Sequence, residues 1–186
     1  MRKIIDIVKT LLSTPAYAFG FIVLISFASL SAAFISEAFF GLEPCNLCIY
    51  QRYPFALGIL IGLAGLILRN NTKAMRKLLG LCGLNFLINS GIAFYHTGVE
   101  QKWWDSALEG CTVPLFFDDT SDQSILENLM SAPAASCSDI QWQDPILGLS
   151  MANYNIVLCF GLFVFCFLSA FLIKTHQGSS ENQEQE

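Results

Sequence analysis

The residues best suited to chemistry in this chain are cysteines, and four of the seven fall into two pairs. Cys45 and Cys48 form a Cys-x-x-Cys motif, whereas Cys111 and Cys137 stand further apart in a later, polar segment. A Cys-x-x-Cys motif alone serves redox sites and zinc sites alike, so its surroundings must decide between them. The other three lie in apolar segments, where cysteine behaves as a small buried hydrophobe: Cys82, Cys159 and Cys166.

The surroundings of the Cys-x-x-Cys motif favour a thiolate at Cys48. Pro44 precedes the motif, where a helix can begin without losing a hydrogen bond, and a helix N-terminus favours negative charge. Arg52 lies four residues after Cys48, hence on the same helix face. An unperturbed cysteine, with a pKa of about 8.5, is only roughly 3% thiolate at pH 7, so a nearby guanidinium would raise that fraction. The alternative role for Arg52 is to extend its charge to the membrane surface.

The elements that must position these residues are membrane-spanning helices. Hydrophobic residues make up 54% of the 186-residue chain and charged residues 13%, against about 25% charged in soluble proteins; mean hydropathy is +0.53. This composition excludes a disordered chain and argues against a soluble domain, and a net charge of -5 leaves no basic face for nucleic acid. We expect an all-α membrane protein whose single integral domain, residues 1–186, is a four-helix bundle with spans near 16–36, 45–68, 78–95 and 152–173.

Basic residues orient the expected spans. Most of the ten Lys and Arg residues flank the first span, the link between the second and third, and the end of the fourth. Because basic residues mark the cytoplasmic side, we expect cytoplasmic termini, including the tail 174–186, and outer loops near 37–44 and 96–150. The first span is expected to remain as an anchor, because it is longer than a signal-peptide core and lacks a clear cleavage site before Glu37. Both cysteine pairs then face an oxidising compartment, where disulfides persist.

The long outer loop carries all three Trp residues and a predicted short helix. Trp103, Trp104 and Trp142 suit anchoring at the membrane interface. Ser124-Ile-Leu-Glu127 is a capping-box pattern, and the apolar residues around it fall on one helical stripe that ends before Pro133. This amphipathic helix would lie on the bilayer surface, or alternatively form a small core within the loop.

Three segments together resemble the disulfide bond formation protein B (DsbB) family. They are Glu43-Pro-Cys-Asn-Leu-Cys-Ile-Tyr-Gln-Arg52; Tyr95-His-Thr-Gly-Val-Glu100 followed by Trp103-Trp104 and Cys111; and Cys137 followed by Trp142 and Leu147-Gly-Leu-Ser-Met151. The resemblance extends over about residues 16–173. It implies a quinone-linked thiol oxidase of the bacterial inner membrane with four spans and periplasmic redox sites.

By position, the resemblance implies a route for electrons. Cys45 and Cys48 would pass electrons to a membrane quinone, ubiquinone or menaquinone. Cys48 would contact the quinone, and Arg52 would stabilise that contact. Cys111 and Cys137 would oxidise a periplasmic thioredoxin-fold protein of the DsbA type. The partner would attack Cys111, after which Cys137 would attack the first pair.

Two further features are less defined by the sequence. His96, expected at the outer end of the third span, would donate a hydrogen bond to a quinone carbonyl or would merely cap the helix. The loop 112–136 carries no motif that we can assign, including its Phe116-Phe117-Asp-Asp stretch. The choice of partner protein therefore stays open at this point.

Three alternatives remain at the level of sequence. A structural site in which four cysteines bind zinc needs the same residues, although the two pairs differ in spacing and face an oxidising compartment. An enzyme of the vitamin K epoxide reductase type also combines a four-helix bundle, a quinone and a Cys-x-x-Cys motif, but there the motif is expected late in the bundle. A dedicated paralogue that serves one secreted client would share every feature described above.

Overall fold

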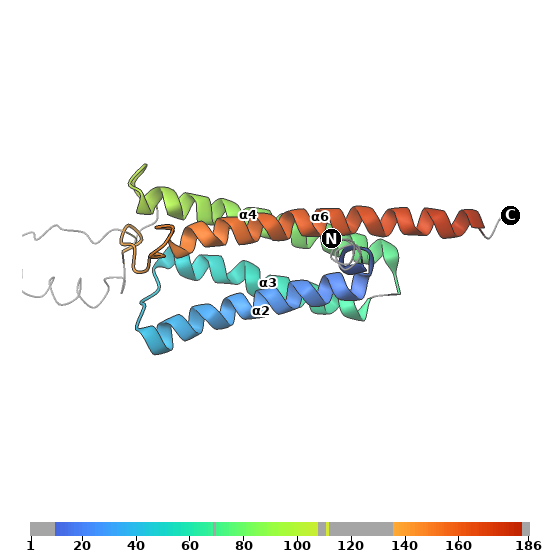
Figure 1. Cartoon of the computed structure of the whole chain (residues 1–186), viewed down its shortest axis with the longest axis horizontal. Helices are drawn as coiled ribbons and strands as arrows, with labels where there is room; N and C mark the ends of the chain where they lie inside the picture. The colour runs from blue at the N-terminus through green and yellow to red at the C-terminus, as the bar shows by residue number, and fades with distance from the viewer. Residues whose placement is uncertain (1–9, 69, 108–110, 112–135, 184–186) are drawn as a thin grey trace, which may run out of the picture.

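The computed structural model describes residues 10–68, 70–107, 111 and 136–183, and its long elements are four α-helices. They are α2 (Pro15–Phe40), α3 (Asn46–Ile67), α4 (Thr72–Glu100) and α6 (Met151–Gln183). The helices lie side by side along the long axis of the molecule (Figure 1). Each is long and apolar enough to cross a membrane, α6 over Met151–Ile173. The chain is therefore an all-helical, multi-pass membrane protein, which confirms the fold class predicted from the sequence.

The helix α4 extends beyond its expected span in both directions. Hydropathy marks only the apolar part of this helix, residues 78–95, but α4 is longer at both ends. At its start, the side-chain oxygen of Asn71 accepts the backbone N–H of Ala74 at 3.1 Å, an N-cap that satisfies an otherwise free donor. Basic residues that we expected in the link between spans therefore lie in the first turns of α4. At the other end, His96 lies one turn inside the helix.

The junction between α2 and α3 places the Cys-x-x-Cys motif at a helix start. The end of α2 is marked by Gly41, which has a φ of 64° and donates its N–H to the Glu37 carbonyl at 3.2 Å. Cys45 is the N-cap of α3, and its sulfur accepts the backbone N–H of Cys48 at 3.3 Å. The motif thus occupies the first turn of α3, as expected from the preceding Pro44.

The bundle is built from two closely packed helix pairs. α2 packs along α3 and α4 along α6, while contacts between α3 and α4 join the pairs. Glycines allow the close approach of α2 to α3, because a Cβ on Gly62 would lie 2.5 Å from Val23 and one on Gly65 would lie 2.4 Å from Phe19. The buried core includes the three cysteines that the sequence predicts as small hydrophobes, among Phe19, Ile22, Phe55, Ile61, Leu79, Cys82, Phe86, Cys159, Leu162 and Cys166.

Polar contacts join the end of α4 to the start of α6. The Ser150 hydroxyl donates a hydrogen bond to the Glu100 carboxylate, and the Thr97 hydroxyl donates to Asn153 Oδ1 at 3.1 Å. These bonds satisfy polar groups at the end of the bundle that also holds the Cys-x-x-Cys motif. The predicted amphipathic helix around 124–130 lies outside the described residues.

Candidate active site

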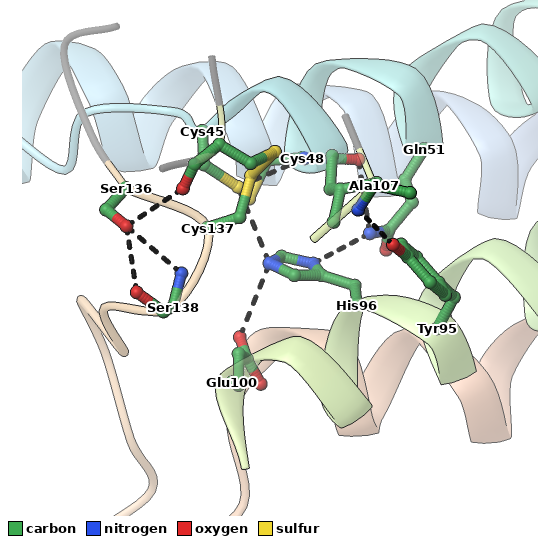
Figure 2. Close-up of a disulfide and its surroundings, with 12 residues drawn as sticks. Cys45, Cys48, Gln51, Tyr95, His96, Glu100, Ala107, Ser136, Cys137 and Ser138 are labelled. Atoms are coloured by element: carbon green, nitrogen blue, oxygen red, sulfur yellow. Dashed lines mark hydrogen bonds and ion pairs between the residues drawn. A yellow bond between two sulfur atoms is a disulfide. The ribbon is translucent and has the colours of Figure 1, made fainter. Parts of the chain in front are cut away.

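Both cysteine pairs lie in one buried cluster at the end of the bundle where α3 begins and α4 ends. Cys111 and Cys137 form a disulfide, and both residues are fully buried. Cys45 is buried in the same cluster, and Cys48 packs against it (Figure 2). We define the cysteine cluster as these four residues with three apolar neighbours: Leu47, Tyr95 and Val99. The structure thus brings together the four cysteines singled out in the sequence.

The backbone around the disulfide is held by hydrogen bonds as well as by the covalent bond. Cys137 donates its N–H to the Cys111 carbonyl at 3.2 Å, and the Ser136 hydroxyl donates to the same carbonyl at 3.0 Å. The Ser136 oxygen in turn accepts the Ser138 N–H at 3.3 Å. These bonds would keep the two cysteine-bearing segments together when the S–S bond opens, which is what a reversible disulfide requires.

Cys45 is the sulfur of the Cys-x-x-Cys motif that is arranged to carry negative charge. Its Sγ lies 2.9 Å from Cys48 Sγ and 3.5 Å from His96 Nε2. It also accepts the Cys48 N–H, because the N-cap position faces the free N–H groups at the start of α3. The hydrogen bond from the Cys48 thiol, supported by His96, lowers the pKa of Cys45 below its ordinary value, while burial opposes this shift. The thiolate at Cys48 that the sequence predicts, in contact with a quinone, stays a prediction.

His96 is buried between the sulfurs and two polar side chains. Only 4% of the residue is exposed, so it does not lie at an exposed helix end. Its Nδ1 lies 2.9 Å from the Gln51 side-chain nitrogen, and its Nε2 lies 3.7 Å from a carboxylate oxygen of Glu100. The ring therefore bridges α3 and α4 beside Cys45, and helix capping is not what positions it.

Arg52 is held by contacts with α2. Its guanidinium forms an ion pair with Glu37 and lies 5.2 Å from the centre of the Phe34 ring. Pairing with an acid reduces the cost of a cation at membrane depth. Within the described residues, the ion pair of Arg52 is with Glu37 and does not involve the sulfur of Cys45 or Cys48. Arg52 and Cys48 nevertheless line the same cavity. The predicted effect of Arg52 on the Cys48 thiol stays a prediction.

Sequence reasoning missed three polar residues of the site: Glu37, Gln51 and Glu100. Helical spacing could have found two of them, since Gln51 follows Cys48 by three residues and Glu100 follows His96 by four. Glu37 is the first charged residue after a long uncharged run, which is typical of an acid with a partner near the membrane. Their pairings across helices needed the structure.

A cavity of about 530 Å³ opens beside the Cys-x-x-Cys motif. Its walls are mostly apolar and come from all four helices and from residues 139–142. Its polar side includes both sulfurs of the motif together with Gln51, Arg52, His96 and Glu100. A flat, largely apolar molecule with a polar edge would therefore reach Cys45 and Cys48.

The same corner contains three groups that could bind a metal by distance alone. The sulfurs of Cys45 and Cys48 and a ring nitrogen of His96 all lie within 4.8 Å of one another. Two sulfurs and an imidazole suit zinc or another thiophilic ion. The choice between metal binding and a hydrogen bond to sulfur depends on which ring nitrogen of His96 carries the proton.

Comparison with known proteins gives a consistent result over most of the chain. Residues 15–169 match the sequence model of a family described as "Disulfide bond formation protein DsbB". "Disulfide bond formation protein B" of Xanthomonas axonopodis pv. citri is 30% identical over 149 residues, which cover 78% of this chain and 84% of that protein. The protein of the same name from Xylella fastidiosa (strain Temecula1) is 36% identical over 118 residues, covering 62% and 66%.

A further relative carries no functional name. "Uncharacterized protein RP370" of Rickettsia prowazekii is 31% identical over 156 residues, which cover 84% of this chain and 88% of the relative. No solved structure matches the chain. The range matched by the family model, 15–169, includes the Cys-x-x-Cys motif, all of α4 and the first part of α6.

Proposed function

The chain belongs to the disulfide bond formation protein DsbB family, and we propose that it reoxidises a periplasmic thioredoxin-fold protein of the DsbA type and passes the electrons to a membrane quinone. By family it is a disulfide oxidoreductase that acts in disulfide bond formation. Its proposed location is the bacterial inner membrane, with cytoplasmic termini and the cysteine cluster on the periplasmic side.

The observation that supports this function most strongly is the packing of both cysteine pairs in one cluster. Thiol–disulfide exchange requires a thiolate to reach a disulfide sulfur directly. Cys45 and Cys137 belong to the same buried cluster, so a thiolate released from the loop pair would meet the first pair. The alternative of a four-cysteine zinc site is not favoured, because the Cys111–Cys137 disulfide removes two of the four ligands that it needs.

The proposed exchanges move two electrons from the partner to the first pair. Each step forms one S–S bond and breaks another, so the number of disulfide bonds stays the same. A thiolate of the partner attacks Cys111, the Cys111–Cys137 bond breaks, and Cys137 leaves as a thiolate. Cys137 attacks the oxidised first pair at Cys45, and Cys48 leaves with the electron pair. The partner's second thiolate then forms the partner's own disulfide and releases Cys111, which attacks Cys137 and releases Cys45. The partner is oxidised, and Cys45 and Cys48 become a dithiol.

Reoxidation of that dithiol needs an acceptor of two electrons and two protons, which a bound quinone, ubiquinone or menaquinone, would supply. The cavity fits such a molecule, because its apolar walls suit a ring and hydrocarbon tail and its polar side holds both sulfurs. In this proposal Cys48 faces the ring and Arg52 faces the negative charge that develops on a carbonyl oxygen. His96 also lines the cavity, and the donor that it would offer a carbonyl is the same Nε2 group that faces Cys45 Sγ.

Energetics support coupling of the two pairs. A DsbA-type protein is a strong oxidant of about −120 mV, and a structural disulfide near about −300 mV could not reoxidise it, since the difference opposes transfer by roughly 8 kcal/mol. A quinone linked to respiration drains electrons from the first pair and so pulls the earlier exchanges forward. Because the two pairs pack in one cluster, oxidation of the first pair by quinone is directly coupled to exchange at the loop pair.

The experiment that tests this function is a quinone-reduction assay. The protein purified in detergent is mixed with a reduced DsbA-type protein and a short-chain quinone, and quinone absorbance is followed. We expect Cys45→Ser and Cys48→Ser to abolish reduction, whereas Cys166→Ala, outside the cysteine cluster, should keep it. Normal turnover in either first-pair variant would exclude the proposed route.

A further inference from the structure

We propose that Gln51 is a positioning residue that fixes His96 in the tautomer with its proton on Nε2, so that the ring donates a hydrogen bond to the Cys45 sulfur. The inference rests on the proposed function only in taking Cys45 and Cys48 as the electron-carrying pair. Figure 2 shows His96 between Gln51 on one side and Cys45 and Glu100 on the other.

The orientation of the Gln51 side-chain amide is fixed at both ends. Its Nε2 lies 3.2 Å from the backbone carbonyl oxygen of Leu47. A carbonyl only accepts hydrogen bonds, so this end of the amide must be the NH2 group. At the other end, Gln51 Oε1 accepts a hydrogen bond from Asn155 Nδ2 at 2.6 Å. A reversed amide would face acceptor with acceptor at Leu47.

The fixed amide decides the protonation of His96. The same NH2 group of Gln51 lies 2.9 Å from His96 Nδ1 and uses its second hydrogen there. Nδ1 must then accept, so the neutral ring carries its proton on Nε2. That N–H then faces Cys45 Sγ at 3.5 Å, within hydrogen-bond distance for sulfur, while Glu100 Oε1 lies slightly further away at 3.7 Å.

The surrounding network holds this arrangement inside the bundle. Gln51 and His96 are only 6% and 4% exposed. Asn89 of α4 donates to the Gln51 backbone carbonyl and to Cys159 Sγ, each at 3.2 Å, and the Cys159 thiol donates to Asn155 Oδ1 at 3.2 Å. A buried polar network with most members satisfied is rigid, because breaking one bond leaves a desolvated group.

Other titratable groups face this corner and bear on Cys45. Cys48 lies on α3, and Glu100 on α4 contacts His96. Glu37 of α2 is paired with Arg52, and Glu43 and Asp139 also line the cavity. The Cys48 thiol favours the Cys45 thiolate most, His96 of α4 adds to this, and the Glu100 carboxylate opposes it. The position of the His96 proton therefore contributes to the charge state of this sulfur.

The proposed tautomer also distinguishes a hydrogen bond from His96 to Cys45 from binding of a metal ion by His96. A metal on Nε2 would need the ring proton on Nδ1, where it would meet the Gln51 NH2 group. With this tautomer, His96 Nε2 presents an N–H donor to the two sulfurs rather than a lone pair that could bind a metal. Added zinc is consequently a useful competitor in the test.

The first test reads the tautomer directly. The chain has two histidines, so His176→Gln leaves His96 as the single signal in protein labelled with 15N-histidine. We expect nitrogen shifts of an unprotonated Nδ1 and a protonated Nε2 in the reduced protein, with no change in the matched control Gln101→Leu, at the exposed C-cap that follows α4. A protonated Nδ1 before any variant is made, or zinc bound at Nε2 at stoichiometric concentration, would overturn the proposal.

Two variants of Gln51 distinguish a change of tautomer from a general loss of folding. Gln51→Glu keeps the shape but can only accept, so it should draw the ring proton to Nδ1. Gln51→Leu should remove the hydrogen bond to His96 Nδ1 and give a mixture of tautomers. In a Cys48→Ser background, Gln51→Leu should raise the pKa of Cys45 by about one unit, which is a tenfold loss of thiolate at pH values below that pKa, as read from alkylation rate against pH. An unchanged tautomer in Gln51→Glu would refute the positioning role.

The outcome is distinct from that of the quinone assay. Neither the nitrogen shifts nor the alkylation profile requires a quinone or a partner protein. If the tautomer is as proposed but no quinone is reduced, the proposed function fails and the role of Gln51 stands. If quinone is reduced but Gln51→Glu leaves Nδ1 unprotonated, the role of Gln51 fails and the function stands.

Discussion

Cys45 and Cys137 lie in the same buried cluster, although Cys45 caps the start of α3 and Cys137 follows the long segment between α4 and α6. This relationship makes the loop disulfide and the Cys-x-x-Cys motif one unit, joined through Leu47 and Val99. An exchange between the pairs would then need a change of bonding within the cluster rather than a docking step.

Removal of one loop cysteine should trap the partner. We expect Cys137→Ser, but not Cys111→Ser, to accumulate a mixed disulfide with a DsbA-type protein that lacks its own resolving cysteine. An added mild oxidant takes up the two electrons and two protons as the Cys111 thiol and the partner thiol join, and the product persists because no Cys137 thiolate can attack Cys111 and displace the partner. Non-reducing gels followed by peptide mass spectrometry give the linkage. Trapping through Cys137 in the Cys111→Ser protein would reverse the two roles.

Loss of the Arg52 charge should weaken the quinone half-reaction. We expect Arg52→Met to raise the quinone KM and to lower turnover by at least about tenfold, or about 1.4 kcal/mol, because no fixed cation then faces the developing charge on oxygen. Exchange between the partner and the loop pair should continue. Arg52→Lys keeps a charge but loses the planar fork, so part of the activity should remain.

The ion pair with Glu37 supplies the control for this experiment. Arg52→Met alone leaves a half-buried carboxylate without its cation, and that could reduce activity by itself. The double variant Arg52→Met/Glu37→Gln removes the unpaired charge. Activity that stays low in the double variant supports a direct role of Arg52, whereas full recovery would assign the loss to Glu37.

The reactivity of Cys45 in the reduced protein should depend weakly on pH. The Cys48 thiol and His96 lower the pKa of Cys45, so its thiolate persists below the ordinary value of about 8.5. We expect its alkylation rate to stay nearly constant from about pH 8.5 to about pH 7, where a free cysteine slows more than tenfold. His96→Phe should restore part of the steep dependence; equal profiles in both proteins would contradict the role of the ring.

The same shift sets the sign of a stability effect. Because the pKa of Cys45 is lower in the folded than in the unfolded protein, the thiolate contributes fully to stability above the unfolded pKa, and this contribution is lost as pH falls through the folded pKa. The free energy of unfolding of the reduced protein should therefore rise with pH between the two values. Denaturant titrations of the reduced protein against His96→Phe would show it.

The sequence was sufficient for the helices because hydropathy and capping act locally. The uncharged run before Glu37 and the proline before Cys45 predict one helix end and one helix start. Hydropathy failed at the start of α4, because the first turns carry basic residues and only the cap at Asn71 marks the true beginning. At the other end of α4 the apolar run stops at residue 95, so the sequence predicts His96 at the surface. The helix continues to Glu100, and His96 lies inside it and is buried.

The site was predictable only as far as its residues share one helix. Spacing along α3 placed Arg52 and Cys48 on one face, but the partner of Arg52, Glu37, is on α2. Gln51 acts on His96 across the interface with α4, and no pattern within either helix encodes that contact. Cys45 is favoured by a local bond, the N-cap from the Cys48 N–H, and by the contact with His96 of α4, and only the second depends on tertiary packing.

The central claim is that electrons pass from the loop disulfide to the Cys-x-x-Cys pair within the cysteine cluster. The most direct measurement is disulfide mapping in the double variant Cys48→Ser/Cys111→Ser, which leaves Cys45 and Cys137 without their usual partners. We predict that mild oxidation of the folded protein links Cys45 to Cys137 nearly completely, and more than in the denatured protein. Absence of this link, while both cysteines stay free or pair elsewhere, would contradict direct transfer between the two pairs.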